Sequence, residues 1–175
     1  LDSNSLVLNI DLNSTLNYHQ SRELLVMQLE DILTPDRCYC QISGVSKKRL
    51  LTTIGELIAN NSESLESEQV FGALMAREQL GTTGLGNGIA IPHSRVPFCN
   101  EIIGALITLD TPIDFDAMDS KPVDLFFVLI VPEVKTDEHV ETLAKIAEML
   151  NDEDFCYTLR HTQDSDDLYN IAITY

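Results

Sequence analysis

No apolar stretch of this chain is long enough to cross a membrane. The longest uninterrupted apolar run covers residues 125–131, whereas a transmembrane helix needs roughly 20 such residues. Near its start the chain also lacks a basic region followed by a solid apolar stretch, so a secretory signal peptide is not supported. We therefore expect no membrane insertion and interpret the run at 125–131 as a buried strand.

Positive charge is scarce as well. The chain has 11 Lys and Arg against 28 Asp and Glu, which gives a formal net charge of −17 and a pI near 4.3. A chain with this charge repels a phosphate backbone, and only Lys47, Lys48 and Arg49 form a local basic cluster. Nucleic acid is therefore not expected as a partner.

Signals for a metal or a cofactor are also missing. Cys38, Cys40, Cys99 and Cys156 form no CxxC pair and have no zinc-site spacing. We interpret them as small buried side chains in a reducing cytosol. The chain contains neither the GxGxxG order of a dinucleotide site nor the GK[ST] of a P-loop, so we expect no cofactor and no metal.

The 175 residues fit one domain with a single core. Residues 1–26 begin with Leu, are rich in Asn, Ser and Leu, and precede Met27, which is a plausible natural start. We interpret 1–26 as a leader or appended segment and 27–175 as the domain.

Strands and helices alternate from Met27 onward. A short strand is expected at 38–42, then a helix capped by Ser46 that runs to about residue 60. A second helix would begin at Ser64 or Ser67 and stop at Gly81, with Arg77 near its end. Strands at 102–109 and 123–131 follow, and the segment between them, with Pro112 and Pro122, reads as turns.

The last third is predicted to be helical. Thr136 or Asp137 would cap a helix, and shorter helices follow at 155–161 and 166–173. The strand at 123–131 is apolar on both faces, as in the centre of a sheet covered on both sides. We therefore predict an α/β fold, a three-layer α/β/α sandwich whose mixed central sheet is flanked by helices. The apolar face of the first of these helices is expected to comprise Val140, Leu143, Ala147 and Leu150.

The chain has only four histidines, namely His19, His93, His139 and His161. His19 belongs to the leader. His161 ends a predicted helix, where a cation suits the macrodipole, so a structural role is expected for it.

His93 follows a glycine-rich turn and Pro92. Glycines such as Gly86 and Gly88 let the backbone approach an anion closely, and the proline stiffens the chain just before the imidazole. A neutral imidazole is a nucleophile near neutral pH, and Ser94 and Arg95 could donate to phosphate oxygens. The spacing alone leaves a structural role for His93 equally open.

Two further residues could bind an anion beside His93. His139 would lie in the first turn of a helix, where unpaired N–H groups and the dipole favour negative charge. Arg77 could neutralise a phosphate, although it could also be a surface residue paired with Glu78 or Glu101. His139 could likewise be only a solvated first-turn residue.

Four segments of the chain form a recognisable pattern, namely GNGIAIPH at 86–93, TPIDFDAMD at 111–119, PVDLFFVLIVP at 122–132 and EHVETL at 138–143. Together they resemble the mannitol/fructose-type IIA domains of the phosphoenolpyruvate-dependent phosphotransferase system. The resemblance runs from Met27 to the C-terminus, and the segments 29–34 and 40–49 look most like the nitrogen-regulatory branch.

The resemblance implies roles for individual residues. His93 matches the phosphorylated histidine, His139 the second active-site histidine, and Arg77 the arginine near the phosphate. Ser94 departs from the small glycine often found after the histidine. It would neighbour the phosphate together with Arg95, Gly86 and Gly88.

The resemblance also implies a cytoplasmic phosphotransferase that works as a stoichiometric relay and regulator. It would accept a phosphoryl group from an HPr-like carrier and act by contact on nitrogen- or potassium-related targets such as transporters or sensor kinases. One alternative is a sugar-specific IIA component that passes the group to a IIB domain. Another is a binding module in which His93 and His139 hold a metal or form a contact surface.

Overall fold

The computed structural model describes residues 27–134 and 136–175. The leader expected at 1–26, including His19, lies outside the described residues. Within them, no helix has the length and apolar character needed to cross a membrane. The elements in chain order are α2 (Leu29–Ile32), the 3-10 turn η1 (Pro35–Arg37), β1 (Cys38–Ile42), α3 (Lys47–Asn60), α4 (Ser67–Gln79), β2 (Gly84–Gly86), β3 (Ile89–Ala90), β4 (His93–Arg95), β5 (Ile103–Ile113), β6 (Val123–Val131), α5 (Asp137–Met149), α6 (Glu153–His161) and α7 (Ser165–Ile173).

The strands form one mixed sheet within the described part of the chain. Its order is β1-β5-β6-β3-β2, and β4 also pairs with β6. β5 is parallel to β1 and antiparallel to β6, whereas β3 and β4 both run parallel to β6. β6 is thus the central strand, as its apolar sequence predicted, and every residue in it except Asp124 is buried.

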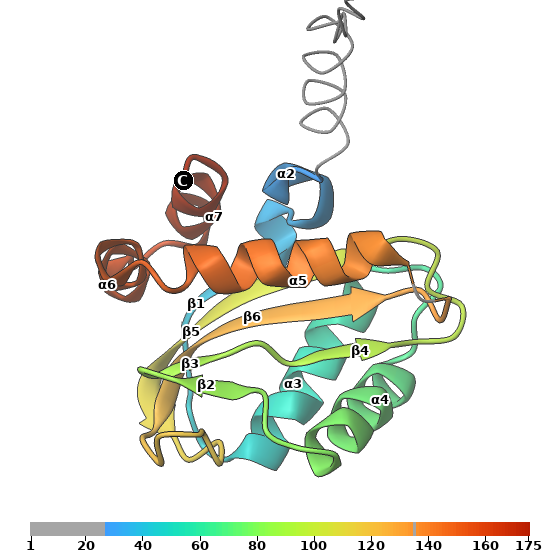
Figure 1. Ribbon diagram of the computed structural model, residues 1–175, viewed down its shortest axis with the longest axis horizontal. Coiled ribbons are helices and arrows are strands. Elements are labelled where there is room, and N and C mark those ends of the chain that lie inside the picture. The colour runs from blue at the N-terminus through green and yellow to red at the C-terminus, as the bar shows by residue number, and fades with distance from the viewer. Residues whose placement is uncertain (1–26, 135) are drawn as a thin grey trace, which may run out of the picture.

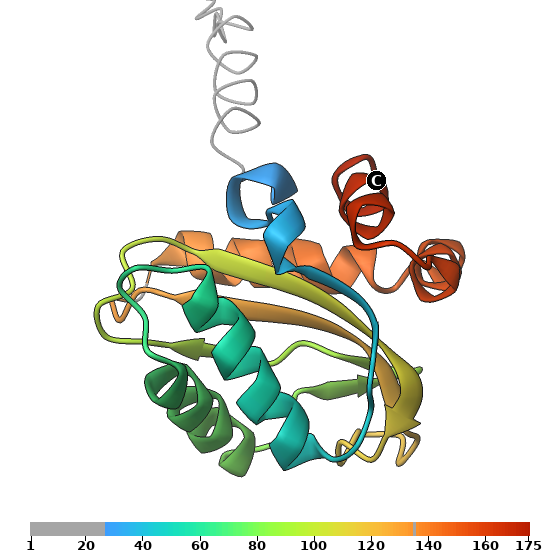
Figure 2. The same ribbon diagram turned by 180° about the vertical axis from the view of Figure 1, so that it is seen from behind.

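Helices cover both faces of this sheet, as Figures 1 and 2 show from opposite sides. Alternate residues of β6 enter two separate cores, because successive side chains of a strand point to opposite faces. Phe126, Val128 and Ile130 pack in the core that contains α3 and α4. Leu125, Phe127 and Leu129 pack in the other core, with α2, α5, α6 and α7. The predicted three-layer α/β/α sandwich is confirmed.

Several local predictions hold and others need correction. Ser46 caps α3, its hydroxyl oxygen accepting from the Arg49 N–H at 3.3 Å. The N-cap of α4 is Glu66 rather than Ser64 or Ser67. β5 continues to Ile113, so Pro112 lies in a strand and not in a turn; the register with β6 is irregular there, and a missing N–H is tolerated.

The predicted apolar face of α5 is confirmed except at Val140, because Leu150 is buried and Leu143 and Ala147 are partly buried against the core. Val140 is 55% exposed, whereas Ile146, Met149 and Leu150 are buried. Thr142, one turn before Ile146, is buried as well, so the buried face of the helix extends toward Thr142 and leaves Val140 out. Val140 is thereby left at the surface beside His139.

The four cysteines are free thiols. Cys38, Cys99 and Cys156 are buried and Cys40 is half-buried. Burial raises the pKa of the Cys38 thiol to about 12, so this side chain stays protonated at neutral pH. The interpretation of the cysteines as small core residues is confirmed for the three buried ones.

Candidate active site

A cleft opens along β4, between α4 on one side and α5 on the other. Its volume is about 770 Å³. Five of the residues singled out from the sequence line it, because β4 carries His93, Ser94 and Arg95 while α4 carries Arg77 and α5 carries His139. The lining residues are Ala73, Ala76, Arg77, Leu80, His93, Ser94, Arg95, Leu129, Val131, His139, Val140 and Leu143.

His93 is the first residue of β4 and pairs with Leu129 of the central strand. The Leu129 N–H donates to the carbonyl of Pro92 at 2.9 Å, which ties the backbone just before the imidazole to β6. The Nδ1 atom of His93 lies 2.8 Å from the carbonyl oxygen of Ile91. A carbonyl only accepts, so the neutral ring carries its proton on Nδ1 and keeps the lone pair on Nε2.

The surroundings of His93 favour its neutral form. Burial is the largest cause and lowers the pKa of the imidazole below 6.5; the Ile91 carbonyl opposes this shift. Arg77 lowers the pKa further, and Glu78 raises it. Because the net direction is downward, His93 is neutral at pH 7 and has a free nucleophilic nitrogen.

A pH titration tests this electrostatic account. We expect the His93 ring signals in NMR to titrate with a midpoint below 6.5, whereas in urea the same ring should titrate near the ordinary value of about 6.5. Since the folded pKa is the lower one, this residue makes the free energy of unfolding fall as the pH drops from 6.5 through the folded pKa. A folded midpoint above 6.5 contradicts the account.

His139 lies in the first turn of α5, close to the positive end of the helix dipole. Its Nδ1 atom is buried and has no hydrogen-bond partner among the described residues. Nε2 is therefore the ring nitrogen available to a group in the cleft. A proton on Nε2 would let His139 donate to an anion there, with the N-terminus of α5 adding to the positive potential.

Arg77 stands in the last turn of α4. Its Nη1 donates to the carbonyl of Gly81 at 2.9 Å, which holds the guanidinium at the end of the helix. The sequence left open a pairing with Glu78 or Glu101. No such ion pair occurs among the described residues; Glu78 pairs with Lys47 instead.

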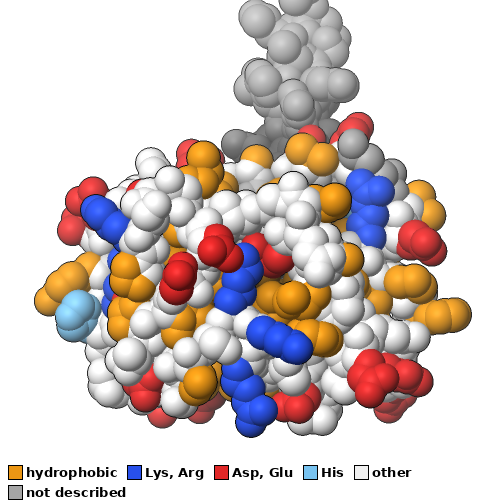
Figure 3. Space-filling model, turned by 90° about the horizontal axis from the view of Figure 1, so that it is seen from below, with side chains coloured by type: hydrophobic (Ala, Val, Ile, Leu, Met, Phe, Trp, Pro, Cys, Tyr) orange, Lys and Arg blue, Asp and Glu red, His pale blue; other side chains and the backbone are white. Residues whose placement is uncertain are grey.

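Ser94 and Arg95 continue β4 beyond His93 and line the same cleft. The Ser94 hydroxyl donates only weakly, to the Arg95 carbonyl at 3.4 Å, so it can turn toward a bound anion. In Figure 3, Lys and Arg side chains lie beside hydrophobic ones near the middle of the face seen from below. Arg77 and Arg95 line the cleft. Their positive charge lets an anion approach the site although the net charge of the chain is −17.

The two glycines expected beside His93 lie elsewhere. Gly86 and Gly88 belong to the β2–β3 hairpin and do not line the cleft; Gly86 lines a different cleft, against α6. At Gly88, with φ at 76°, an added Cβ would stand 2.6 Å from the Arg160 Nη2 atom. That nitrogen donates to the Asn87 carbonyl at 2.8 Å. The glycine therefore serves the hairpin turn and the close approach of Arg160.

Sequence reasoning missed part of the site. Leu80 is 86% exposed and Val140 is 55% exposed, and both line the cleft as apolar residues. Their positions in the chain could have indicated this, because Leu80 follows the last turn of α4, near Arg77, and Val140 directly follows His139. Among the described residues, no group of three or more His, Cys, Asp or Glu side chains is placed to hold a metal ion.

The chain is similar to known proteins in sequence and in structure. A family model described as phosphoenolpyruvate-dependent sugar phosphotransferase system, EIIA 2, matches residues 31–173. A protein of Pseudomonas aeruginosa named nitrogen regulatory protein is 47% identical over 148 residues, which cover 85% of this chain and 96% of that protein.

Solved structures of related proteins have the same fold as this chain. The crystal structure of nitrogen regulatory protein IIA-Ntr from Neisseria meningitidis superposes with a TM-score of 0.76 and is 39% identical, covering 81% of this chain and 96% of that one. Mannitol IIA from Escherichia coli has a TM-score of 0.65 at 20% identity, covering 80% of this chain and 98% of the other. At that identity, the second likeness concerns the fold alone.

Proposed function

The chain belongs to the EIIA 2 family of the phosphoenolpyruvate-dependent sugar phosphotransferase system, whose members are phosphotransfer components, and we propose that His93 is its phosphoryl acceptor. The observation that carries the proposal is the hydrogen bond from Nδ1 of His93 to the Ile91 carbonyl. This bond leaves Nε2 unprotonated in a cleft that also contains an arginine and a second histidine.

The transfer follows from this arrangement. The lone pair on Nε2 of His93 attacks the phosphorus of a phosphohistidine on an HPr-like carrier. The new N–P bond forms as the old one breaks, and the departing electron pair stays on the donor's ring nitrogen. Phosphoryl transfer of this kind depends mainly on positioning and charge stabilisation. Arg77 and the Nε2–H of His139 would supply the charge stabilisation.

The nitrogen-regulatory branch fits better than a sugar-specific role. Relatives named nitrogen regulatory protein reach 47% identity, whereas the mannitol IIA structure is only 20% identical. Phosphorylation would add about two negative charges to a cleft with the exposed apolar residues Leu80 and Val140. Such a change alters which protein can dock there. The targets would be nitrogen- or potassium-related transporters or sensor kinases, met in the cytoplasm.

Intact-mass measurement tests the proposal. The chain is incubated with phosphoenolpyruvate, the matching enzyme I and the HPr-like carrier. We expect an acid-labile gain of one phosphoryl group, and phosphorus–nitrogen coupling in NMR should place it on Nε2. No gain, while the carrier itself becomes phosphorylated, excludes the acceptor role; a group on Nδ1 contradicts the tautomer assigned to His93.

A further inference from the structure

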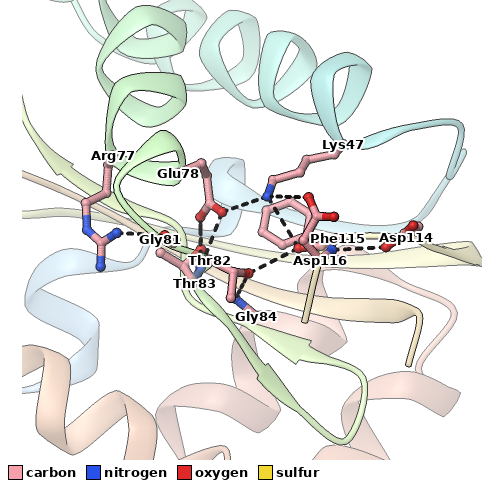
Figure 4. A network of polar contacts seen from close by, with 10 residues as sticks. All are labelled: Lys47, Arg77, Glu78, Gly81, Thr82, Thr83, Gly84, Asp114, Phe115 and Asp116. Carbon is pink, nitrogen blue, oxygen red and sulfur yellow. Dashed lines mark hydrogen bonds and ion pairs between the residues drawn. The ribbon is translucent and has the colours of Figure 1, made fainter. Parts of the chain in front are cut away.

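A buried carboxylate lies directly behind the cleft. Glu78 follows Arg77 at the end of α4, and its side chain is only 3% exposed. Its Oε2 atom lies 2.9 Å from the Nζ of Lys47, the first residue of α3. Lys47 also contacts Asp116 at 3.2 Å and lies 4.6 Å from the ring centroid of Phe115. Figure 4 shows these groups converging on the side of α4 away from the Arg77 guanidinium.

Glu78 also fixes the segment that leaves α4. The Thr83 backbone N–H donates to both of its carboxylate oxygens, at 3.2 and 3.3 Å, and the Thr83 hydroxyl donates to Oε1. The Gly81 N–H donates to the backbone carbonyl of Glu78 at 3.2 Å. Residues 81–83 are therefore held tightly against the end of the helix.

Among the described residues, the Arg77 guanidinium is hydrogen-bonded to one protein group, and that group belongs to residues 81–83. That group is the Gly81 carbonyl, which accepts from Nη1 at 2.9 Å. The path from Glu78 to Arg77 thus runs through Thr83 and Gly81, and each step is a hydrogen bond or a short stretch of chain. A shift of the 81–83 segment would move the acceptor that orients the guanidinium.

A contribution to stability does not by itself explain why a buried carboxylate, Glu78, is paired with Lys47 at this place. A buried ion pair can often be replaced by apolar side chains without loss of stability, because the desolvation of both charges offsets their attraction. Hydrogen bonds to a charged group do, however, fix geometry strongly. A carboxylate that accepts from a backbone N–H, a hydroxyl and an ammonium is well suited to hold a segment in one position.

We propose that Lys47, Glu78 and Thr83 form a positioning network that holds Arg77 at the phosphoryl site through the Gly81 carbonyl. The inference rests on the proposed acceptor role of His93. Glu78 is then a positioning residue, which acts on the reaction only through Arg77. A misplacement of about 1 Å in such a group can lower a rate about 100-fold.

A double-mutant cycle tests the network. Glu78→Ala is made in the natural chain and in the Arg77→Ala variant, and single-turnover uptake is measured with the phosphorylated HPr-like carrier as donor. We expect Glu78→Ala to lower the saturating rate about 10- to 100-fold, with little change in the donor concentration that gives half that rate. In the Arg77→Ala background it should lower the rate no further, because the two residues act as one unit. Glu78→Gln, which keeps an oxygen acceptor for Thr83, should retain most of the rate.

Two further measurements separate the outcomes. Asp116→Ala removes the exposed partner of Lys47 and leaves the Thr83 contacts intact, so uptake should stay near that of the natural chain. If Glu78→Ala does not fold, Thr83→Val, which removes only the hydroxyl donor, takes its place in the cycle. In Glu78→Ala, the Nη protons of Arg77 should exchange faster with water and lose their separate NMR chemical shifts, because the hydrogen bond to the Gly81 carbonyl is weakened.

Additive losses in the cycle, or unchanged guanidinium signals, overturn the inference and make the network purely structural. Absence of uptake by the natural chain overturns the proposed function instead. In that case the guanidinium signals still decide whether Glu78 positions Arg77.

Discussion

His93→Ala is expected to take up no phosphoryl group, while the chain keeps its fold. Among the described residues that line the cleft, His93 is the only histidine with a carbonyl oxygen beside its Nδ1 atom, which leaves a free lone pair on Nε2. The substitution removes this nitrogen. The fold should survive because His93 is half-buried at the start of a short strand, and both hydrophobic cores lack its side chain. Intact mass after incubation with the donor system measures the first effect, and circular dichroism measures the second.

His161→Ala is the matched control for this variant. His161 ends α6, bonds to the Tyr157 carbonyl and stacks on the Tyr157 ring, so it lies outside the cleft. It should take up one phosphoryl group as the natural chain does. Full uptake by His93→Ala would show that another residue accepts the phosphoryl group and would contradict the role proposed for His93.

The largest change in stability is expected from Lys47→Met. This substitution leaves the Glu78 carboxylate, 3% exposed, without its counter-charge. Breaking a buried pair by removing one partner costs about 3–5 kcal/mol, because an uncompensated charge stays in the interior. The free energy of unfolding, measured with urea, should fall by about that amount.

A second substitution should restore much of the loss. Lys47→Met with Glu78→Gln leaves no buried charge, and the amide oxygen of the introduced glutamine still accepts from Thr83. Asp116→Ala, by contrast, should change stability by less than about 1 kcal/mol, because the Asp116 side chain is 76% exposed. Equal losses in Lys47→Met and in the double variant would show that the buried charge is not the cause.

Much of the fold could be predicted because its signals are local. The run at 125–131 identified the central strand, and Ser46 identified the start of α3. The errors arose where tertiary contacts override local preference. Pro112 ends up in β5 at an irregular register, and Val140 turns outward because the buried face of α5 is set by Thr142 and Ile146.

The site was predictable only in part, for a similar reason. His93 and His139 stood out through their immediate neighbours, and the structure brings them into one cleft. The hydrogen bond that selects Nε2 of His93 depends on where the Ile91 carbonyl points, and the sequence holds no sign of that. The pairing of Lys47 with Glu78 joins residues from different helices, so spacing along the chain could not reveal it.

The two-sided covering of the sheet has a mechanical consequence. Arg77 is carried by the layer of α3 and α4, and His139 by α5 in the opposite layer, with His93 on the strand between them. A phosphoryl group on His93 that bonds to both Arg77 and His139 would link the two helical layers across the edge of the sheet. Phosphorylation of His93 would then restrict the motion of the two layers relative to each other. The binding of a partner would depend on this rigidity as well as on the added charge.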